Sequence, residues 1–221
     1  MTRSVRLFFG HTLVVVLAVS STGCMGSMRF SSPAPRGHGR IGLVPELAAG
    51  HAYDRSIGPQ PGGSVEYRRG LSDALDVGGR VFLVGAAVDA RHVLTRADTV
   101  ETSFGLGGRV GASTFTSDPW VGYEIAVEPA LRLGVNVSQA SQLAFALVPA
   151  LVYSRNQVAG AADIVKKGVS FAPELVVAFD VGLSDAVHIV PLVGATSFVG
   201  SDSFHFTDDT ARLRAALGFY F

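Results

Sequence analysis

The last eleven residues of the chain alternate between two kinds of side chain, and this alternation restricts the fold more than any other feature of the sequence. From Ala211 to Phe221, apolar residues occupy every second position, with two arginines and smaller or aromatic residues between them. Because side chains alternate sides along a β-strand, this stretch predicts a strand with one apolar and one more polar face. The apolar face could lie against a soluble core or against lipid.

The same alternation recurs downstream of Arg40, in short stretches separated by turn-forming residues. The clearest are Trp120–Asn136 and Phe171–Leu183, where one face is uncharged and the other mixes Gly and Ala with charged residues. Small residues among paired charges suit the narrow interior of a barrel better than a surface turned to water. The pattern predicts an all-β fold, a closed antiparallel up-and-down transmembrane β-barrel over residues 40–221.

The number of strands depends on residues 84–102. A tight turn at Val84-Gly85, followed by a strand over Ala86–Thr95, gives ten strands, whereas one long excursion over 89–119 gives eight. We prefer ten because Ala86–Thr95 alternates well and is long enough to span a bilayer. Short connections are expected at 71–74, 137–141 and 183–186. Longer, more polar connections are expected at the external end: 51–62, 114–119, 156–167 and 200–209.

A short proline motif recurs within the predicted strands. Proline lacks a backbone donor and is usually confined to strand edges or bulges. We therefore predict bulges that help bend the closed sheet at five positions: Pro45, Pro129, Pro149, Pro173 and Pro191.

The first 23 residues have the features of a signal peptide. Arg3 and Arg6 precede an apolar segment over 7–19, and the small residues at 21–23 precede Cys24, the single cysteine of the chain. This arrangement is similar to a bacterial lipobox, which implies lipidation of Cys24 and, with Met25 next, delivery to the outer membrane. The alternative is an ordinary signal peptide cut near residue 20. Residues 24–39 lack periodicity and are interpreted as a flexible tether.

The predicted inner face carries as many arginines as carboxylates. In a barrel of eight to ten strands these side chains can fill the interior and pair with one another, which predicts a largely plugged lumen. The charged residues expected there are Glu66, Arg68, Asp76, Arg80, Asp89, Arg91, Arg109, Glu124, Glu128, Arg132, Glu174, Asp180, Arg212 and Arg214.

The sequence offers little for catalysis, metals or nucleic acid. Its 18 basic and 18 acidic residues give no basic field for nucleic acid. His51 with Asp54, and His205 with nearby Ser and Asp, fall in predicted loops, but their spacing matches no catalytic motif. No His/Cys cluster has metal-site spacing. We predict a protein that is not an enzyme and has no cofactor.

A chain that ends on Phe after apolar residues at alternate positions resembles small bacterial outer-membrane β-barrel proteins of the OmpA/OmpX-type class. Near-identical turns at 70–74 and 182–186 are typical of periplasmic turns in that class. The resemblance implies a location in the outer membrane of a Gram-negative bacterium, contact with its lipid and insertion by the barrel-assembly machinery. It assigns the assembly signal to the closing strand: Leu213, Leu217, Phe219 and Phe221.

Three functional hypotheses remain open at this point. The first is a non-enzymatic outer-membrane barrel with a structural or surface-interaction role, a salt-bridged lumen and external loops that contact a partner. The second is a narrow, porin-like channel for small solutes. The third is a lipid-anchored, lipocalin-like barrel that binds an apolar ligand, and it requires the apolar faces to point inward.

Overall fold

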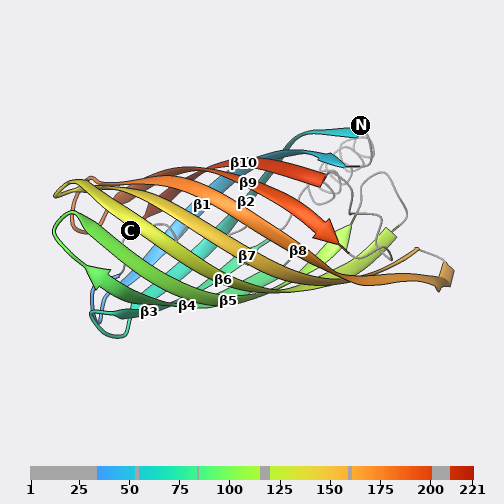
Figure 1. Cartoon of the computed structure of the whole chain (residues 1–221), viewed down its shortest axis with the longest axis horizontal. Coiled ribbons are helices and arrows are strands. Elements are labelled where there is room, and N and C mark those ends of the chain that lie inside the picture. Colours follow the sequence, from blue (N-terminus) through green and yellow to red (C-terminus); the bar gives the residue numbers. More distant parts are fainter. Residues whose placement is uncertain (1–33, 53–54, 84, 115–119, 159–160, 201–209) are drawn as a thin grey trace, which may run out of the picture.

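The computed structural model describes residues 34–52, 55–83, 85–114, 120–158, 161–200 and 210–221 (Figure 1). Ten antiparallel strands, each paired with its neighbours in sequence, form a closed barrel in which the last strand pairs with the first. The predicted signal peptide, Cys24 and the start of the predicted tether lie outside the described residues. No helix among the described residues is long and apolar enough to cross a membrane.

The ten-strand prediction is confirmed, including the strand over residues 86–95. The strands are β1 (Gly39–Ala52), β2 (Arg55–Gly70), β3 (Leu75–Phe82), β4 (Gly85–Arg96), β5 (Val100–Thr114), β6 (Trp120–Ser138), β7 (Ser141–Val158), β8 (Ala161–Gly182), β9 (His188–Gly200) and β10 (Thr210–Tyr220).

The outer surface of the barrel is apolar on all ten strands. One large apolar side chain from each strand, exposed by 40% to 67%, illustrates this: Leu43, Val65, Val81, Val88, Leu106, Leu131, Leu147, Leu175, Val193 and Leu213. Water would disfavour such a surface, whereas lipid tails would not. The lipocalin-like hypothesis, which required these faces to point inward, is therefore wrong.

The two ends of the barrel differ in construction. At the end that carries Gly39 and Phe221, the strand connections are short, at 71–74, 97–99, 139–140 and 183–187. At the opposite end β7 and β8, of 18 and 22 residues, are much longer than the roughly 9–11 residues that span a bilayer. Figure 1 shows this hairpin extending beyond the end of β9. Both termini of the barrel lie at the end with the connections 71–74 and 183–187, and we call it the periplasmic end because the turns predicted to be periplasmic lie there.

Two of the predicted external loops are wrong in extent. Residues 55–62 belong to β2 and pair with β1, and most of 156–167 belongs to β7 and β8. Their polar residues suggested loops, but a strand that continues into water needs no apolar face, because its backbone hydrogen bonds remain paired. The predicted loops at 114–119 and 200–209 lie almost entirely outside the described residues.

The proline bulges were not found. Irregularities of register occur elsewhere, near Ala48, Val93, Asn136 and Gln157, and none occurs at a proline. Pairing lapses for two or three residues on one side of each of these prolines and resumes in the same register. Each proline thus interrupts one ladder without adding a residue to its strand.

Candidate functional site

The interior of the barrel contains the charged residues predicted to line it. Eleven are buried: Glu66, Arg68, Asp76, Arg80, Arg91, Arg109, Glu128, Arg132, Glu174, Asp180 and Arg214. Asp89, Glu124 and Arg212 are half-buried. Three further charged residues are buried with them, namely Arg40, Glu46 and Glu101. Their alternate positions along the strands place them on the inner face, but the sequence analysis did not assign them there because they lie near strand ends or a proline.

The first charged cluster lies near the periplasmic end, on β2, β3 and β4. Arg68 binds both Asp76 and Asp89 through its two terminal nitrogens. Arg91 approaches the other side of Asp76. Two guanidinium groups and two carboxylates thus neutralise one another, which offsets the cost of burying charge.

A second cluster spans the interior between strands that are not neighbours. Arg80 of β3 donates to Glu128 of β6 at 3.2 Å, although β4 and β5 separate these strands in the sheet. Arg109 of β5 donates to the other oxygen of Glu128 at 2.8 Å and also binds Glu124. Glu128 therefore joins two arginines across the space enclosed by four strands.

A third cluster links β5, β6 and β7 near the periplasmic end. Arg132 donates to Glu101 at 2.8 Å and also binds the side-chain oxygen of Gln142. Gln142 in turn donates to Asn136 at 2.8 Å. At the rim, the half-exposed Arg96 reaches the second oxygen of Glu101 at 3.2 Å.

Other contacts tie the closing strands to the rest of the barrel. Arg214 of β10 binds Glu174 of β8 and lies 3.5 Å from Glu46 of β1. His188 of β9 bonds Asp180 at 2.7 Å through Nδ1, and its Nε2 lies 3.2 Å from Arg40 of β1.

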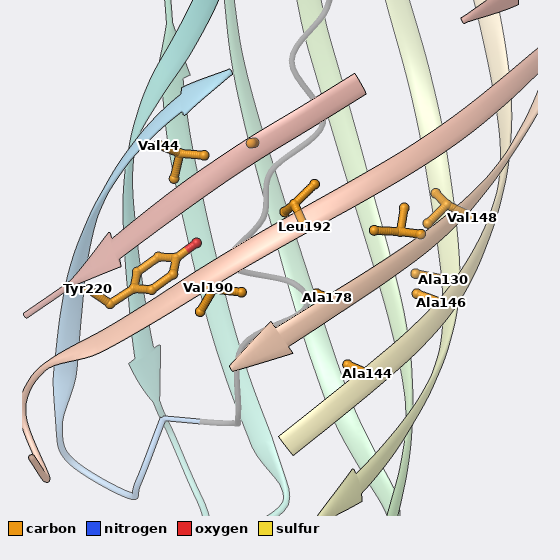
Figure 2. Close-up of a cluster of buried hydrophobic side chains, with 11 residues drawn as sticks. Val44, Ala130, Ala144, Ala146, Val148, Ala178, Val190, Leu192 and Tyr220 are labelled. Carbon is orange, nitrogen blue, oxygen red and sulfur yellow. The ribbon is translucent and has the colours of Figure 1, made fainter. Parts of the chain in front are cut away.

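A second, apolar part of the interior lies on β7, β8 and β9. Ala144, Ala150 and Val190 have no exposed surface, and Val148 and Val176 have almost none. Figure 2 shows Ala144, Val148 and Val190 with Leu192, and Tyr220 of β10 in the same cluster. Sequence reasoning missed this wall because it looked for charge on the inner faces. The signal was the long apolar run of β7, whose small residues alternate with large ones.

The side chain of Tyr220, the last residue of β10, points into the barrel. Its side chain is fully buried, and its hydroxyl lies 3.5 Å from Glu66. The apolar members of the predicted assembly signal face outward: Leu213 and Phe221 are exposed, and Leu217 and Phe219 are partly so. Phe221 exchanges two backbone hydrogen bonds with Ile41, of 2.9 and 3.0 Å, and these help close the seam between β1 and the end of the chain.

The last residues of the predicted tether are not free. Ala34 is buried, and its backbone nitrogen lies 3.3 Å from Asp76 of the first charged cluster. Gly37 and His38 exchange backbone hydrogen bonds with Gly70, and Arg36 forms an isolated bridge there. Residues 34–38 therefore lie against the periplasmic end of β2 and β3.

The described residues include only part of the two candidate catalytic sets, and the metal search covers the described residues alone. No group of three His, Cys, Asp or Glu side chains there could hold a metal ion. His51 lies on β1, whereas Asp54, Ser203 and His205 fall outside the described residues. The acidic residues of the clusters above contact an arginine or a histidine, and Glu66 accepts hydrogen bonds from the hydroxyls of Ser64 and Tyr220.

No protein-family model matches the chain. No curated protein matches it either. Among solved structures, the chain is similar to the attachment invasion locus protein Ail of Yersinia pestis, with 11% identity, a TM-score of 0.40, and coverage of 84% of this chain and 99% of that one. It is similar to Neisserial surface protein A, with 7% identity, a TM-score of 0.48, and coverage of 82% and 95%. It is also similar to the porin KdgM in complex with disordered oligogalacturonate, with 12% identity, a TM-score of 0.42, and coverage of 82% and 98%.

The geometry of the chain itself decides its class. Closed barrels and helices are the structures that satisfy every backbone group within a bilayer, and this closed barrel has an even strand number and an apolar exterior. The chain is a transmembrane β-barrel.

Proposed function

We propose that this protein is a non-enzymatic outer-membrane barrel whose lumen is closed by paired charges. The contact that carries the proposal is the Arg80–Glu128–Arg109 cluster, because it connects β3, β5 and β6 across the interior. An eight-stranded barrel has an interior just wide enough for side chains to fill, and the ten strands here enclose a somewhat wider one that long side chains such as Arg and Glu can bridge. We expect the ion pairs of the charged wall and of the seam to interrupt a continuous water path.

Conductance in planar bilayers tests the closed lumen. The wild-type barrel is expected to give no stepwise single-channel current. Replacing Arg80, Arg109 and Glu128 together by Ala removes three long side chains at one level and should increase the frequency of conducting events at least tenfold. The matched control is the outward-facing Leu151→Ala, which should stay silent. Regular current steps from the wild type would refute the plug and favour the channel hypothesis.

The long strands at the external end support a surface-interaction role. β6, β7 and β8 are longer than the length needed to cross a bilayer. Their hydrogen-bonded backbones therefore continue beyond the membrane on the external side. A paired wall holds its side chains in fixed positions better than a loop does, which suits recognition of another molecule. Shortening β7 and β8 together by removing 156–163 should abolish partner binding and leave the heat-modifiable gel mobility of the barrel intact.

We also propose that the closing strand is the region recognised by the assembly machinery. Deleting Phe221 removes two backbone hydrogen bonds to Ile41 and an exposed apolar side chain at the membrane edge. The assembled fraction in cells, measured by heat-modifiable mobility, should fall severalfold. Phe221→Leu, which keeps both bonds and an apolar residue, is the control and should assemble more than the deletion does. Normal assembly of the deletion variant would refute the proposal.

A further inference from the structure

The outer wall of the β7–β8 hairpin carries two cations directly opposite each other. Arg155 of β7 pairs in register with Lys167 of β8, and both side chains are exposed. Like charges at directly opposite positions destabilise a sheet, since their Cβ atoms are only about 5 Å apart. Within the described part of the chain, no ion pair involves either residue. Such an arrangement is favourable when an anion lies between the two side chains.

The position of Arg155 and Lys167 along the barrel axis indicates what surrounds them. Outward side chains of β8 are apolar from Val181 to Val169, and Lys167 follows next on the same face. At about 3.4 Å per residue and a tilt of roughly 40°, this apolar stretch rises about 30 Å, the thickness of the hydrocarbon core of a bilayer. Lys167 therefore lies at the external edge of the membrane-facing band.

The neighbouring strands place the same boundary at the same level. On β7, apolar outward residues end at Tyr153, one outward position before Arg155. Tyr123 of β6 pairs in register with Arg155, and the rings of Tyr123 and Tyr153 have centroids 6.4 Å apart. Tyrosines of this kind mark the interface between lipid tails and headgroups. The two cations lie just beyond them, at headgroup level.

We propose that Arg155 and Lys167 form a binding site for a phosphate-bearing lipid headgroup of the outer leaflet. A guanidinium group binds phosphate through two parallel hydrogen bonds, and an ammonium group adds a compact charge. Side chains that face outward from the wall, directly above the apolar band, meet lipid headgroups before any soluble ligand. The acyl chains of the same lipid would lie along Leu151, Val169 and Phe171, which are exposed below the pair.

The periplasmic edge of the barrel provides an internal comparison. Arg69 is also exposed on the outer face, but it lies opposite Gly39 on one side and Val77 on the other. Arg96 at that edge binds Glu101. Neither arrangement places two outward cations at directly opposite positions of neighbouring strands, as Arg155 and Lys167 are.

Native mass spectrometry of the detergent-solubilised full chain tests the site. The probes are a glucosamine disaccharide lipid with two phosphates and the same lipid with both phosphates removed. At about 1 kcal/mol per cation near an anionic surface, two cations correspond to a roughly 30-fold preference for the phosphorylated lipid. The double variant Arg155→Gln/Lys167→Gln should lose this preference, and each single variant should lose about fivefold.

The matched control is Arg36→Gln/Arg69→Gln, which removes two exposed cations at the periplasmic edge and should keep the preference. All variants are first checked for heat-modifiable mobility, which reports a folded barrel, and the conservative Arg155→Lys should retain most of the binding. Equal binding of both probes by the wild type, or a preference that survives the double variant, would overturn the proposal. Displacement of the lipid by inorganic pyrophosphate at equal concentration would also overturn it, because the site would then bind free phosphate.

Discussion

Two walls face each other inside this barrel, and they carry different kinds of side chain. The wall formed by β2 to β6 carries long charged side chains such as Arg68, Arg80 and Glu128, whereas the wall formed by β7 to β9 carries mainly Ala and Val. Side chains of small barrels often alternate between large and small to fit the interior. Long charged side chains therefore come mainly from one side of the lumen, and small apolar side chains come mainly from the other.

Removing an arginine from the charged wall should have the largest effect on stability. Arg68→Ala removes the partner shared by the buried Asp76 and the half-buried Asp89, while Arg91 still contacts Asp76, so the free energy of unfolding should fall by about 3 kcal/mol, the lower end for breaking a buried ion pair. The measurement is urea-induced unfolding in lipid vesicles. Val65→Ala, three residues away on the lipid-facing side, is the control. A loss below 1 kcal/mol would mean that the two carboxylates have other compensation.

Adding bulk to the apolar wall should have an intermediate effect. Ala150 is fully buried, so Ala150→Leu must displace its neighbours and should cost about 1–3 kcal/mol in the same unfolding assay. The corresponding change on the outer face, Ala195→Leu at an exposed position of β9, should be tolerated because the new side chain enters lipid. An Ala150→Leu variant as stable as the wild type would show that open space lies beside this wall, contrary to a closed lumen.

A third pair of variants tests how burial affects the stability that an ion pair of the charged wall contributes. Glu101 binds Arg132, whose side chain is 3% exposed, and Arg96, whose side chain is 51% exposed. Arg96→Ala should reduce stability by about 1 kcal/mol or less, because exposed ion pairs contribute little. Arg132→Ala should cost several times more. Equal losses of unfolding free energy for the two variants would show that burial does not determine how much these ion pairs stabilise the barrel.

The fold could be predicted from the sequence because period-two alternation acts on every strand. It gave the strand number, the lipid-facing side and the inward face of residues such as Glu66 and Arg214. The partners inside could not be predicted, because the contact of Arg80 with Glu128 depends on how far β3 and β6 are staggered around the barrel. The extent of β7 and β8 was also missed, since polar residues such as Asn156 and Lys167 resemble a loop when lipid contact ends but backbone pairing continues.

The seam between the first and last strands has a consequence for the order of folding. Gly42 pairs with Tyr220, and Ile41 exchanges backbone hydrogen bonds with Phe221, so residues from opposite ends of the sequence must meet before the sheet has no free edge. Contacts of such high sequence separation form slowly, because the loop-closure entropy is lost before they are made. Until then both edge strands expose unpaired backbone groups, which are open to pairing with another chain. Closure of the barrel therefore cannot begin until β10 has been synthesised.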